Sequence, residues 1–308
     1  MCARGRTGTG SGMADASAAS RPRRAQRRGP GKPAAVPVPA LSDDGARSGQ
    51  EAAGREAGAG PDGARRDDST ALTLLASGKL DVKGRLVDAS NATLYCTVTA
   101  ASSSGQQIEA ACVYKPVAGE RPLWDFPEGT LAGRELSAYL VSRAAGWDVA
   151  PPTVYRDGPF GPGMCQLWID VDDAVDLVEL ARSSSDARLR QMAVFDAVVN
   201  NADRKIGHLL PDLSGHLYGC DHGVCFAPEY KLRTVLWQWR GKKLPVEAVA
   251  ALRRLSRLLD GGSLAAELTG WLSAEEIAAT ASRVELLLEH GVHPYPPTDW
   301  PAVPWPPI

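Results

Sequence analysis

Asp203 and His208 lie in a short polar segment whose residue types suit phosphate and metal chemistry. The segment, Asn-Asn-Ala-Asp-Arg-Lys-Ile-Gly-His over residues 200–208, follows a helical pattern in which Phe195 and Val199 share one face. A carboxylate can position a hydroxyl group, and a neutral imidazole can ligate a metal. The pattern therefore predicts a polar loop with chemical capacity at the end of a helix.

Asp221 is expected to lie beside this loop, although it comes later in the sequence. The apolar runs Leu209–Leu210 and His216–Tyr218 flank Pro-Asp-Leu-Ser-Gly, a turn sequence, and this combination predicts a small hairpin. Because a hairpin brings the chain back to its starting point, the carboxylates of Asp203 and Asp221 would share one place with the imidazole of His208.

Lys115 and Glu135 supply the other parts that phosphoryl transfer from ATP requires. That reaction needs a cation at the phosphates, carboxylates that hold magnesium, and a carboxylate that positions the acceptor hydroxyl. Lys115 ends the run Cys-Val-Tyr-Lys, which predicts a strand that aims one ammonium into a cleft. Glu135 lies in the following helical segment, where it could pair with Lys115 and orient it. Asp221 suits the magnesium role and Asp203 the hydroxyl role.

Four motifs in this order make residues 112–228 resemble the catalytic core of the phosphatidylinositol 3/4-kinase-related enzymes, especially the type II phosphatidylinositol 4-kinases. The motifs are Val-Tyr-Lys115-Pro, Gln166-Leu-Trp-Ile169, Asn201-Ala-Asp203-Arg204 and Asp221-His-Gly-Val-Cys-Phe-Ala-Pro228. The resemblance implies ATP and Mg²⁺ or Mn²⁺ as cofactors, with catalysis by Asp203 and Lys115. It also implies a hinge that meets the adenine, formed by Gln166, Leu167, Trp168 and Ile169. Taken singly, a strand-end lysine or a turn aspartate more often has no such role, and it is their order that favours the interpretation.

The sequence departs from the family pattern at two places. Where the family usually has an asparagine as second metal ligand, five residues after the catalytic aspartate, this chain has His208. Because Mg²⁺ prefers oxygen and Mn²⁺ accepts nitrogen more readily, His208 as a metal ligand predicts a manganese preference or reduced turnover. No glycine-rich loop precedes Lys115, so the Ser90-Asn91 turn is expected to lie over the phosphates instead.

The elements that would position these residues run from strands to helices along the chain. Strands are predicted as a hairpin at 84–87 and 93–99, as a third strand at 108–115, and near 153–155 and 165–169. Helices are predicted at 130–145, 185–199, 245–259 and 273–289, with a short helix or strand at 70–80. Ser273 and Glu276 form a capping-box pattern at the last helix. Strands first and helices later predict an α+β, two-lobed, protein-kinase-like fold with a small β-rich N-lobe and a helical C-lobe.

Three regions follow from this reading. Residues 1–69 are rich in Ala, Gly, Arg and Pro with few large apolar side chains, so they are expected to be a disordered, low-complexity segment. Residues 70–168 would form the N-lobe, and 169–308 the C-lobe with the catalytic loop and the metal-binding Asp segment. The Pro- and Trp-rich residues 294–308 are expected to be an extended surface strap at best.

Charge and composition exclude several classes of protein. Residues 1–70 hold 12 Lys and Arg and 8 Asp and Glu, so the remainder, with 22 and 28, is mildly acidic and predicts no nucleic-acid partner. The six cysteines form no CxxC pair and have no histidine cluster beside them, which predicts a reducing compartment rather than disulfides or zinc. No apolar run approaches the ~20 residues of a membrane span. A cytoplasmic protein is expected.

The acceptor of the phosphoryl group stays open between a protein and a phospholipid. Residues 226–244 interleave tryptophans with five Lys and Arg, a mixture that suits peripheral contact with a membrane and its phosphates, or else ordinary packing on the C-lobe. Two other functions keep the nucleotide site: AMP transfer to a protein, and a kinase-fold nucleotide-binding regulator without catalysis. A scaffold without nucleotide is the remaining alternative.

Overall fold

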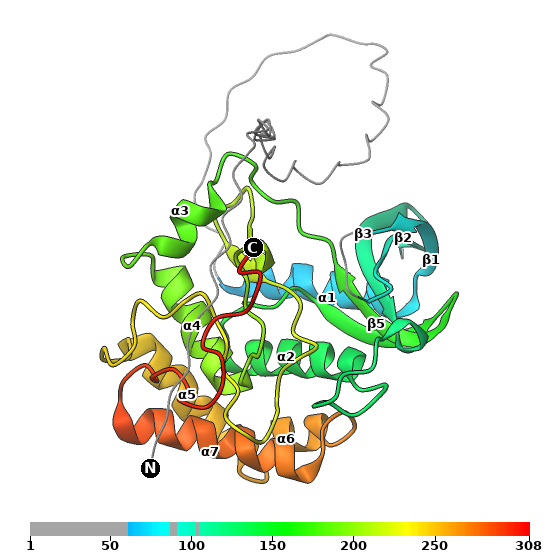
Figure 1. Cartoon of the computed structure of the whole chain (residues 1–308). Coiled ribbons are helices and arrows are strands. Elements are labelled where there is room, and N and C mark those ends of the chain that lie inside the picture. Colours follow the sequence, from blue (N-terminus) through cyan, green and yellow to red (C-terminus); the bar gives the residue numbers. More distant parts are fainter. Residues whose placement is uncertain (1–60, 87–90, 103–104) are drawn as a thin grey trace, which may run out of the picture. The chain divides into compact units, whose positions relative to one another are not determined.

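The computed structural model describes residues 61–86, 91–102 and 105–308, with side chains from Ser69 onward, and these belong to one compact unit. The strands are β1 (Lys79–Arg85), β2 (Leu94–Ala101), β3 (Gln107–Pro116), β4 (Thr153–Gly158), β5 (Gly161–Leu167), β6 (Leu209–Pro211) and β7 (Leu217–Gly219). The helices are α1 (Pro61–Ser77), η1 (Val117–Gly119), α2 (Leu131–Ala145), α3 (Leu177–Arg182), α4 (Ala187–Val199), η2 (Ile206–His208), α5 (Val246–Leu259), α6 (Ser263–Leu268) and α7 (Ala274–His290). In Figure 1 the sheet lies to one side of the molecule, and α4, α5 and α7 lie to the other.

The N-lobe is an antiparallel sheet with the strand order β1-β2-β3-β5-β4, covered on one face by α1. Side chains two residues apart on β2 and β3 point to the same face of a strand, and that face is the buried one. Together with α1 and β5 it forms an apolar cluster of Leu74, Leu75, Cys96, Val98, Cys112, Tyr114 and Cys165. This packing fixes the strand that ends at Lys115.

Helix α2 packs between the sheet and the C-lobe helices and is buried on nearly all sides. Its free N-terminal amides are satisfied by Glu120, whose carboxylate accepts hydrogen bonds from Leu131 N (3.1 Å) and Ala132 N (2.8 Å). It ends at Gly146, which adopts the left-handed conformation (φ 69°) that glycine allows at a helix C-terminus. One face of α2 contributes Ala138, Val141 and Ala145 to the C-lobe core, so the helix is held by both lobes.

The C-lobe is helical and carries a two-stranded sheet, β6-β7. Asp186 caps α4 by accepting hydrogen bonds from the backbone amides of Arg188 and Leu189. The hairpin predicted between His208 and Asp221 is present, with Leu209 opposite Gly219. The predicted capping box of α7 is also confirmed, since Ser273 and Glu276 bond each other's backbone amides.

The α+β, two-lobed, kinase-like fold class predicted from the sequence is confirmed: a β-rich lobe precedes a helical one, with one helix inserted between the third and fourth strands. The expected boundary at residue 69 falls inside α1, which begins at Pro61. Residues 1–60, expected to be disordered, and Ser90 of the expected phosphate turn lie outside the described residues.

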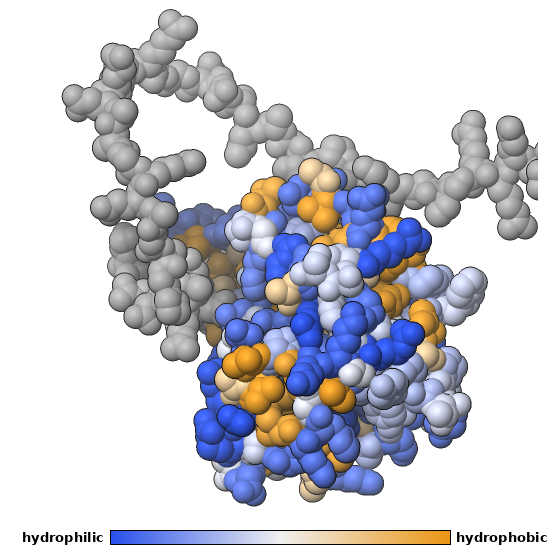
Figure 2. All heavy atoms as spheres, turned by 90° about the vertical axis from the view of Figure 1, so that its left-hand side faces the viewer, coloured by the Kyte–Doolittle hydropathy of each residue, from blue (hydrophilic) through white to orange (hydrophobic). Residues whose placement is uncertain are grey.

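No helix in the described part of the chain combines the length and the apolar character needed to cross a membrane. On the face shown in Figure 2, apolar side chains gather in separate small patches between polar ones.

Candidate active site

Lys115 lies at the centre of a group of charges that the two lobes bring together. Its Nζ is 2.7 Å from Glu135 Oε1 on α2, and it also contacts Asp221 Oδ1, 106 residues further along the chain. The ion pair with Glu135 predicted from the sequence is therefore present. The other carboxylate oxygen of Glu135 accepts a hydrogen bond from His222 N (2.9 Å), which fixes the segment that carries Asp221.

The close approach of these charges shifts their proton affinities. Burial alone would lower the pKa of Lys115, but the carboxylates of Asp221 and Glu135 outweigh it and raise the pKa above its usual value. The Lys115 ammonium in turn holds the pKa of Asp221 well below its usual range. Lys115 therefore carries its positive charge, and Asp221 its negative charge, at every physiological pH.

Asp203 is positioned by a buried polar network beneath its loop. Its backbone amide donates to Asn201 Oδ1 (2.9 Å), and Asn201 Nδ2 donates to Asp196 Oδ1 (3.0 Å) on α4. Asp196 also accepts two bonds from the fully buried guanidinium of Arg204 (2.8 and 3.0 Å). The buried charges of Asp196 and Arg204 are therefore paired, and their network anchors the loop to α4.

Arg204 extends this network to the segment of Asp221. Its guanidinium donates to Cys220 O (3.1 Å) and lies 2.7 Å from His222 Nε2. Burial and the neighbouring guanidinium lower the pKa of His222 well below its usual value, so the ring is neutral and accepts this bond. Arg204 thus joins the loop with Asp203 to the segment with Asp221.

Asp221 itself has a left-handed backbone conformation (φ 57°), which is unfavourable for a residue with a side chain. Such strain persists only where the surroundings impose it, and it is concentrated at functional sites. Two hydrogen bonds on either side of Asp221 hold its backbone in this conformation. The amide of His222 donates to Glu135, and the carbonyl of Cys220 accepts from Arg204.

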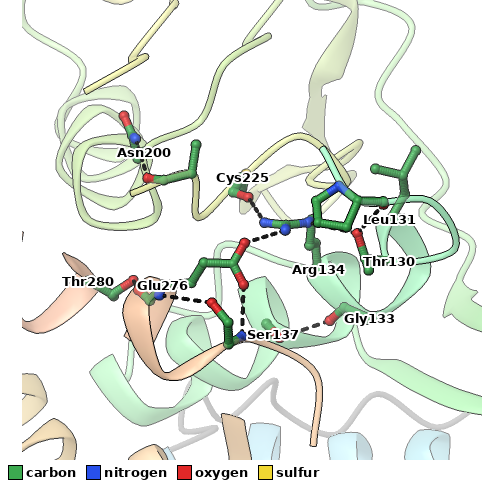
Figure 3. A network of polar contacts seen from close by, with 12 residues as sticks. Thr130, Leu131, Gly133, Arg134, Ser137, Asn200, Cys225, Glu276 and Thr280 are labelled. Carbon is green, nitrogen blue, oxygen red and sulfur yellow. Dashed lines mark hydrogen bonds and ion pairs between the residues drawn. The ribbon is translucent and has the colours of Figure 1, made fainter. Parts of the chain in front are cut away.

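Another buried ion pair fixes α2 against the C-lobe, one residue away from Glu135. Arg134 donates to Cys225 O (2.7 Å) and pairs with Glu276, whose other oxygen accepts from Ser273 N (2.8 Å) in the capping box of α7. Figure 3 shows the guanidinium pointing between the carbonyl of Cys225 and the carboxylate of Glu276. Helix α2 is therefore locked in the position in which Glu135 reaches Lys115.

Lys115, Glu135, Asp203 and Asp221 line one cleft of about 310 Å³ between the lobes. Its walls are formed by Asn91, Thr93, Lys115, Pro116, Glu120, Arg121, Leu123, Leu131, Ala132, Glu135, Asp203, Lys205, His208, Asp221, Gly223 and Val224. Asn91, one half of the expected phosphate turn, fixes the rim, because its Oδ1 accepts a hydrogen bond from Arg121 N (2.9 Å). The cleft thus contains five of the predicted site residues.

The four residues of the expected hinge are not part of this cleft. Gln166 and Leu167 end β5, and Trp168 and Ile169 follow it. The side chain of Gln166 is buried in the sheet, where its Nε2 donates to Thr153 Oγ1 (2.9 Å). Trp168 pairs through its backbone amide with Ala111 O (3.0 Å). Their role toward adenine stays a prediction.

The donor groups of the cleft fit a divalent cation that is shared with a nucleotide. No group of three or more His, Cys, Asp or Glu able to hold a metal occurs among residues 61–86, 91–102 and 105–308. Cations of nucleotide-dependent enzymes need only one or two carboxylates, since phosphate oxygens and waters complete their shell. Asp221, with its side chain half exposed, and Asp203 offer those carboxylates.

His208 is placed beside Asp221, as predicted, with Nε2 3.5 Å from Oδ2. Burial lowers the pKa of His208, so the ring is neutral. The amide of Lys205 donates to its Nδ1 (3.5 Å), which leaves the proton on Nε2, facing the carboxylate. In this tautomer Nε2–H faces the Asp221 carboxylate, and His208 would ligate a metal only with the proton moved to Nδ1.

Lys205, like Glu120 and Arg121, is a charged residue of the cleft that the sequence analysis did not assign. Its Nζ lies 3.1 Å from Asp203 Oδ2, which places a second side-chain cation in the cleft, beside the carboxylate of Asp203. Its position two residues after Asp203 was the available signal, but a loop lysine looks the same in sequence whether it faces water or a cleft.

The fold and the cleft together define an α+β, kinase-like protein with a converging lysine, glutamate and pair of aspartates. The chain is 46% identical over 275 residues to Protein Rv2133c of Mycobacterium tuberculosis, a match that covers 77% of this chain and 96% of that protein, and the chain belongs to the same family. No family model matches it.

Three solved structures are similar over most of this chain. A crystal structure of the Golgi casein kinase with Mn/ADP bound has a TM-score of 0.49 at 12% identity and covers 73% of this chain and 75% of its own. Hydra Fam20 with sugar has a TM-score of 0.46 at 13% identity, with 73% and 88% covered. The Helicobacter pylori proinflammatory kinase CtkA has a TM-score of 0.39 at 11% identity, with 71% and 94% covered. Since all three scores are below 0.5, the proposals below rest on the geometry of the chain itself.

Proposed function

We propose that the chain is an ATP-dependent phosphotransferase that transfers the γ-phosphate to a hydroxyl group of a protein or a phospholipid. The observation that carries this proposal is the convergence of Lys115, Glu135 and Asp221 in the cleft that also contains Asp203. Phosphoryl transfer needs a lysine that binds the phosphates, a carboxylate that binds the divalent cation and a carboxylate that positions the acceptor hydroxyl. It requires little else of the protein.

Each side chain has a role that follows from its position. Lys115 binds the phosphates, and Glu135 holds its ammonium in place. Asp203 accepts a hydrogen bond from the acceptor hydroxyl and takes its proton as the new bond to the γ-phosphorus forms. The bond from that phosphorus to the β–γ bridging oxygen breaks at the same time, and ADP leaves. Lys205 offsets negative charge beside Asp203.

A divalent cation, Mg²⁺ or Mn²⁺, bound by Asp221 would neutralise phosphate charge in this scheme. Asp221 suits this role because its low pKa keeps it ionised. His208, whose Nε2–H faces Asp221 at 3.5 Å, then lies beside this carboxylate rather than ligating the metal, so we expect no strong manganese preference.

The finer assignments follow from the resemblance to the phosphatidylinositol 3/4-kinase-related enzymes. They are the division into an N-lobe over 70–168 and a C-lobe over 169–308, and adenine binding at Gln166–Ile169. The resemblance leaves the acceptor open between a protein and a phospholipid, because related folds serve different acceptors.

The direct contact of Lys115 with Asp221 favours one alternative, a regulator that binds nucleotide without turnover, because this contact occupies two groups that catalysis needs. The test uses the full chain with γ-labelled and, separately, α-labelled ATP, each with Mg²⁺ or Mn²⁺. A cell lysate with its membranes supplies the acceptors, and the products are separated into protein and lipid phases. Asp203→Asn and Asp221→Ala run in parallel.

γ-Label in either phase that is absent with both variants supports the proposal and identifies the acceptor class. α-Label in the protein phase would instead show AMP transfer. If neither label is transferred while ATP still raises the melting temperature, the chain is a nucleotide-binding regulator and the proposal is wrong.

A further inference from the structure

The C-terminal residues 295–308, here called the C-terminal segment, lie against the loop that carries Asp203. Three backbone carbonyls of the segment accept hydrogen bonds from the C-lobe. Tyr295 O accepts from the hydroxyl of Tyr230 (2.7 Å), and Pro307 O accepts from Ile206 N (2.9 Å). The red end of the chain in Figure 1 accordingly runs beside the loops that follow α4.

The third carbonyl, that of Ala302, joins the segment to a strand-like stretch beside the catalytic loop. It accepts from Thr234 N (3.0 Å) and from Trp237 Nε1 (2.8 Å). Thr234 forms an isolated β-bridge with Arg204, the residue after Asp203. The order in space is therefore catalytic loop, Thr234, C-terminal segment, which is how an added peptide strand binds to an exposed edge.

The segment contacts the C-lobe through these carbonyls and through the buried Pro304 and half-buried Trp300, while its other large side chains are exposed. The exposed fractions of Trp305, Ile308 and Tyr295 are 86%, 69% and 65%. Its prolines have no amide hydrogen, so the carbonyls are the groups it offers to a groove. Its main side-chain anchor is Trp300, whose ring lies 6.0 Å from that of Trp124 and 5.3 Å from Lys231 Nζ.

The part of the segment nearest to Asp203 cannot itself accept a phosphoryl group. Residues 299–308, Asp-Trp-Pro-Ala-Val-Pro-Trp-Pro-Pro-Ile, contain no Ser, Thr or Tyr. Pro307 makes the contact with the catalytic loop. Its carbonyl accepts the hydrogen bond from the amide of Ile206, the residue after Lys205. The segment therefore has the placement of a bound peptide without the reactive hydroxyl.

We infer that the surface formed by Ile206, Thr234, Trp237 and Lys231, on which the C-terminal segment lies, binds a polypeptide acceptor in an extended conformation, and that the segment is its internal competitor. The inference rests on the proposed function and specifies its substrate class as protein rather than lipid. The N–H donors of this surface recognise main-chain carbonyls, which any extended polypeptide presents in a regular row and a phospholipid headgroup does not. A segment with exposed side chains can be replaced by such a peptide without opening the core.

The test compares two tryptophans of the same segment in the full-length chain. Trp300→Ala removes the anchor, whereas Trp305→Ala removes an exposed ring and is the matched control. The probe is a fluorescent synthetic peptide with the sequence of residues 295–308. We expect Trp300→Ala to bind it about tenfold tighter than the wild type or more, because an intramolecular competitor acts at millimolar effective concentration. Trp305→Ala should bind it as the wild type does.

A second variant that ends at Ala302 keeps Trp300 and frees Ile206 N, and it should also bind the peptide more tightly. Equal binding by the wild type and both variants would overturn the inference, as would loss of cooperative melting in both variants, since the segment would then be part of the core. With γ-labelled ATP and lysate, Trp300→Ala should increase label in the protein phase alone, while label found only in lipid would overturn the inference and leave the kinase proposal standing. Tighter peptide binding without any labelled product would support the peptide-binding surface and contradict the kinase proposal.

Discussion

The ammonium of Lys115 separates two carboxylates that would otherwise face each other in a partly closed cleft. We expect Lys115→Met to reduce phosphoryl transfer by about 10²-fold or more, the usual effect of removing one preorganised charge from a transition state. The fold should persist but with a lower free energy of unfolding, because Glu135 keeps the hydrogen bond from His222 N while its nearly buried carboxylate loses its cation. Transfer from γ-labelled ATP and the urea midpoint measure the two effects.

Lys83→Met is the matched control for this substitution. Lys83 also pairs with an aspartate, Asp81, on a strand of the same sheet, but both side chains are about half exposed. Its activity should equal that of the wild type. An equal loss in both variants would mean that Lys115 acts on the sheet rather than on the nucleotide.

At this scale the sequence identified the residues whose positions follow from a predicted strand or hairpin, and it missed those whose burial decides their role. Lys115 and Asp221 could be found because a strand and a hairpin predict where their side chains meet. Arg204 follows Asp203 directly and cannot be distinguished in sequence from other loop arginines. Nothing in the sequence shows that it forms a buried ion pair with Asp196 of α4.

Among the elements, α2 depends on the ion pair between Arg134 and Glu276 for its position. Both side chains are nearly buried, at 2% and 10% exposure. Removing one partner of such a pair leaves an uncompensated charge, so Arg134→Met should lower the free energy of unfolding by about 3 kcal/mol. It should also reduce activity, because Glu135 follows Arg134 on the helix. Urea unfolding at neutral pH gives the stability change.

The same helix provides the control, Arg143, whose pair with Glu267 is about half exposed at both ends. Arg143→Ala should change stability by less than about 1 kcal/mol. In the double variant Arg134→Met, Glu276→Gln the loss should be smaller than the sum of the single losses. Additive losses would show that the two residues do not act as a pair.

The ends of helices and strands could be predicted where a residue that stops or caps a helix interrupts the apolar periodicity. Gly146 ends α2 and the Ser273–Glu276 capping box begins α7, as expected. The start of α1 was missed because 61–69 contains no large apolar residue that could set a period. The C-terminal segment was underestimated because its bonds use backbone carbonyls, which carry no sequence signal.

At the scale of the whole molecule, buried neutral histidines make the fold sensitive to acid. His293 is nearly inaccessible, at 2% exposure, and its Nε2 accepts a hydrogen bond from Arg190 Nε (3.2 Å). Burial, and then the charges of Arg190 and Lys242, lower its pKa from 6.5 to about 4. Between these two values the unfolded chain binds more protons than the folded one. Stability is therefore complete above about pH 6.5 and falls as the pH falls toward 4.

This linkage has a measurable size. For a shift from 6.5 to about 4, the loss in the free energy of unfolding between pH 7 and pH 5 is about 2 kcal/mol from His293 alone. His293→Gln cannot titrate, so urea unfolding at the two pH values should give a difference smaller by about that amount, whatever the substitution does to stability at pH 7. His290→Gln removes an exposed histidine at the end of α7 and is the control. If His293→Gln retains the full pH difference of the wild type, His293 does not contribute, and the acid sensitivity must come from His222 and His208, whose lowered pKa values act in the same direction.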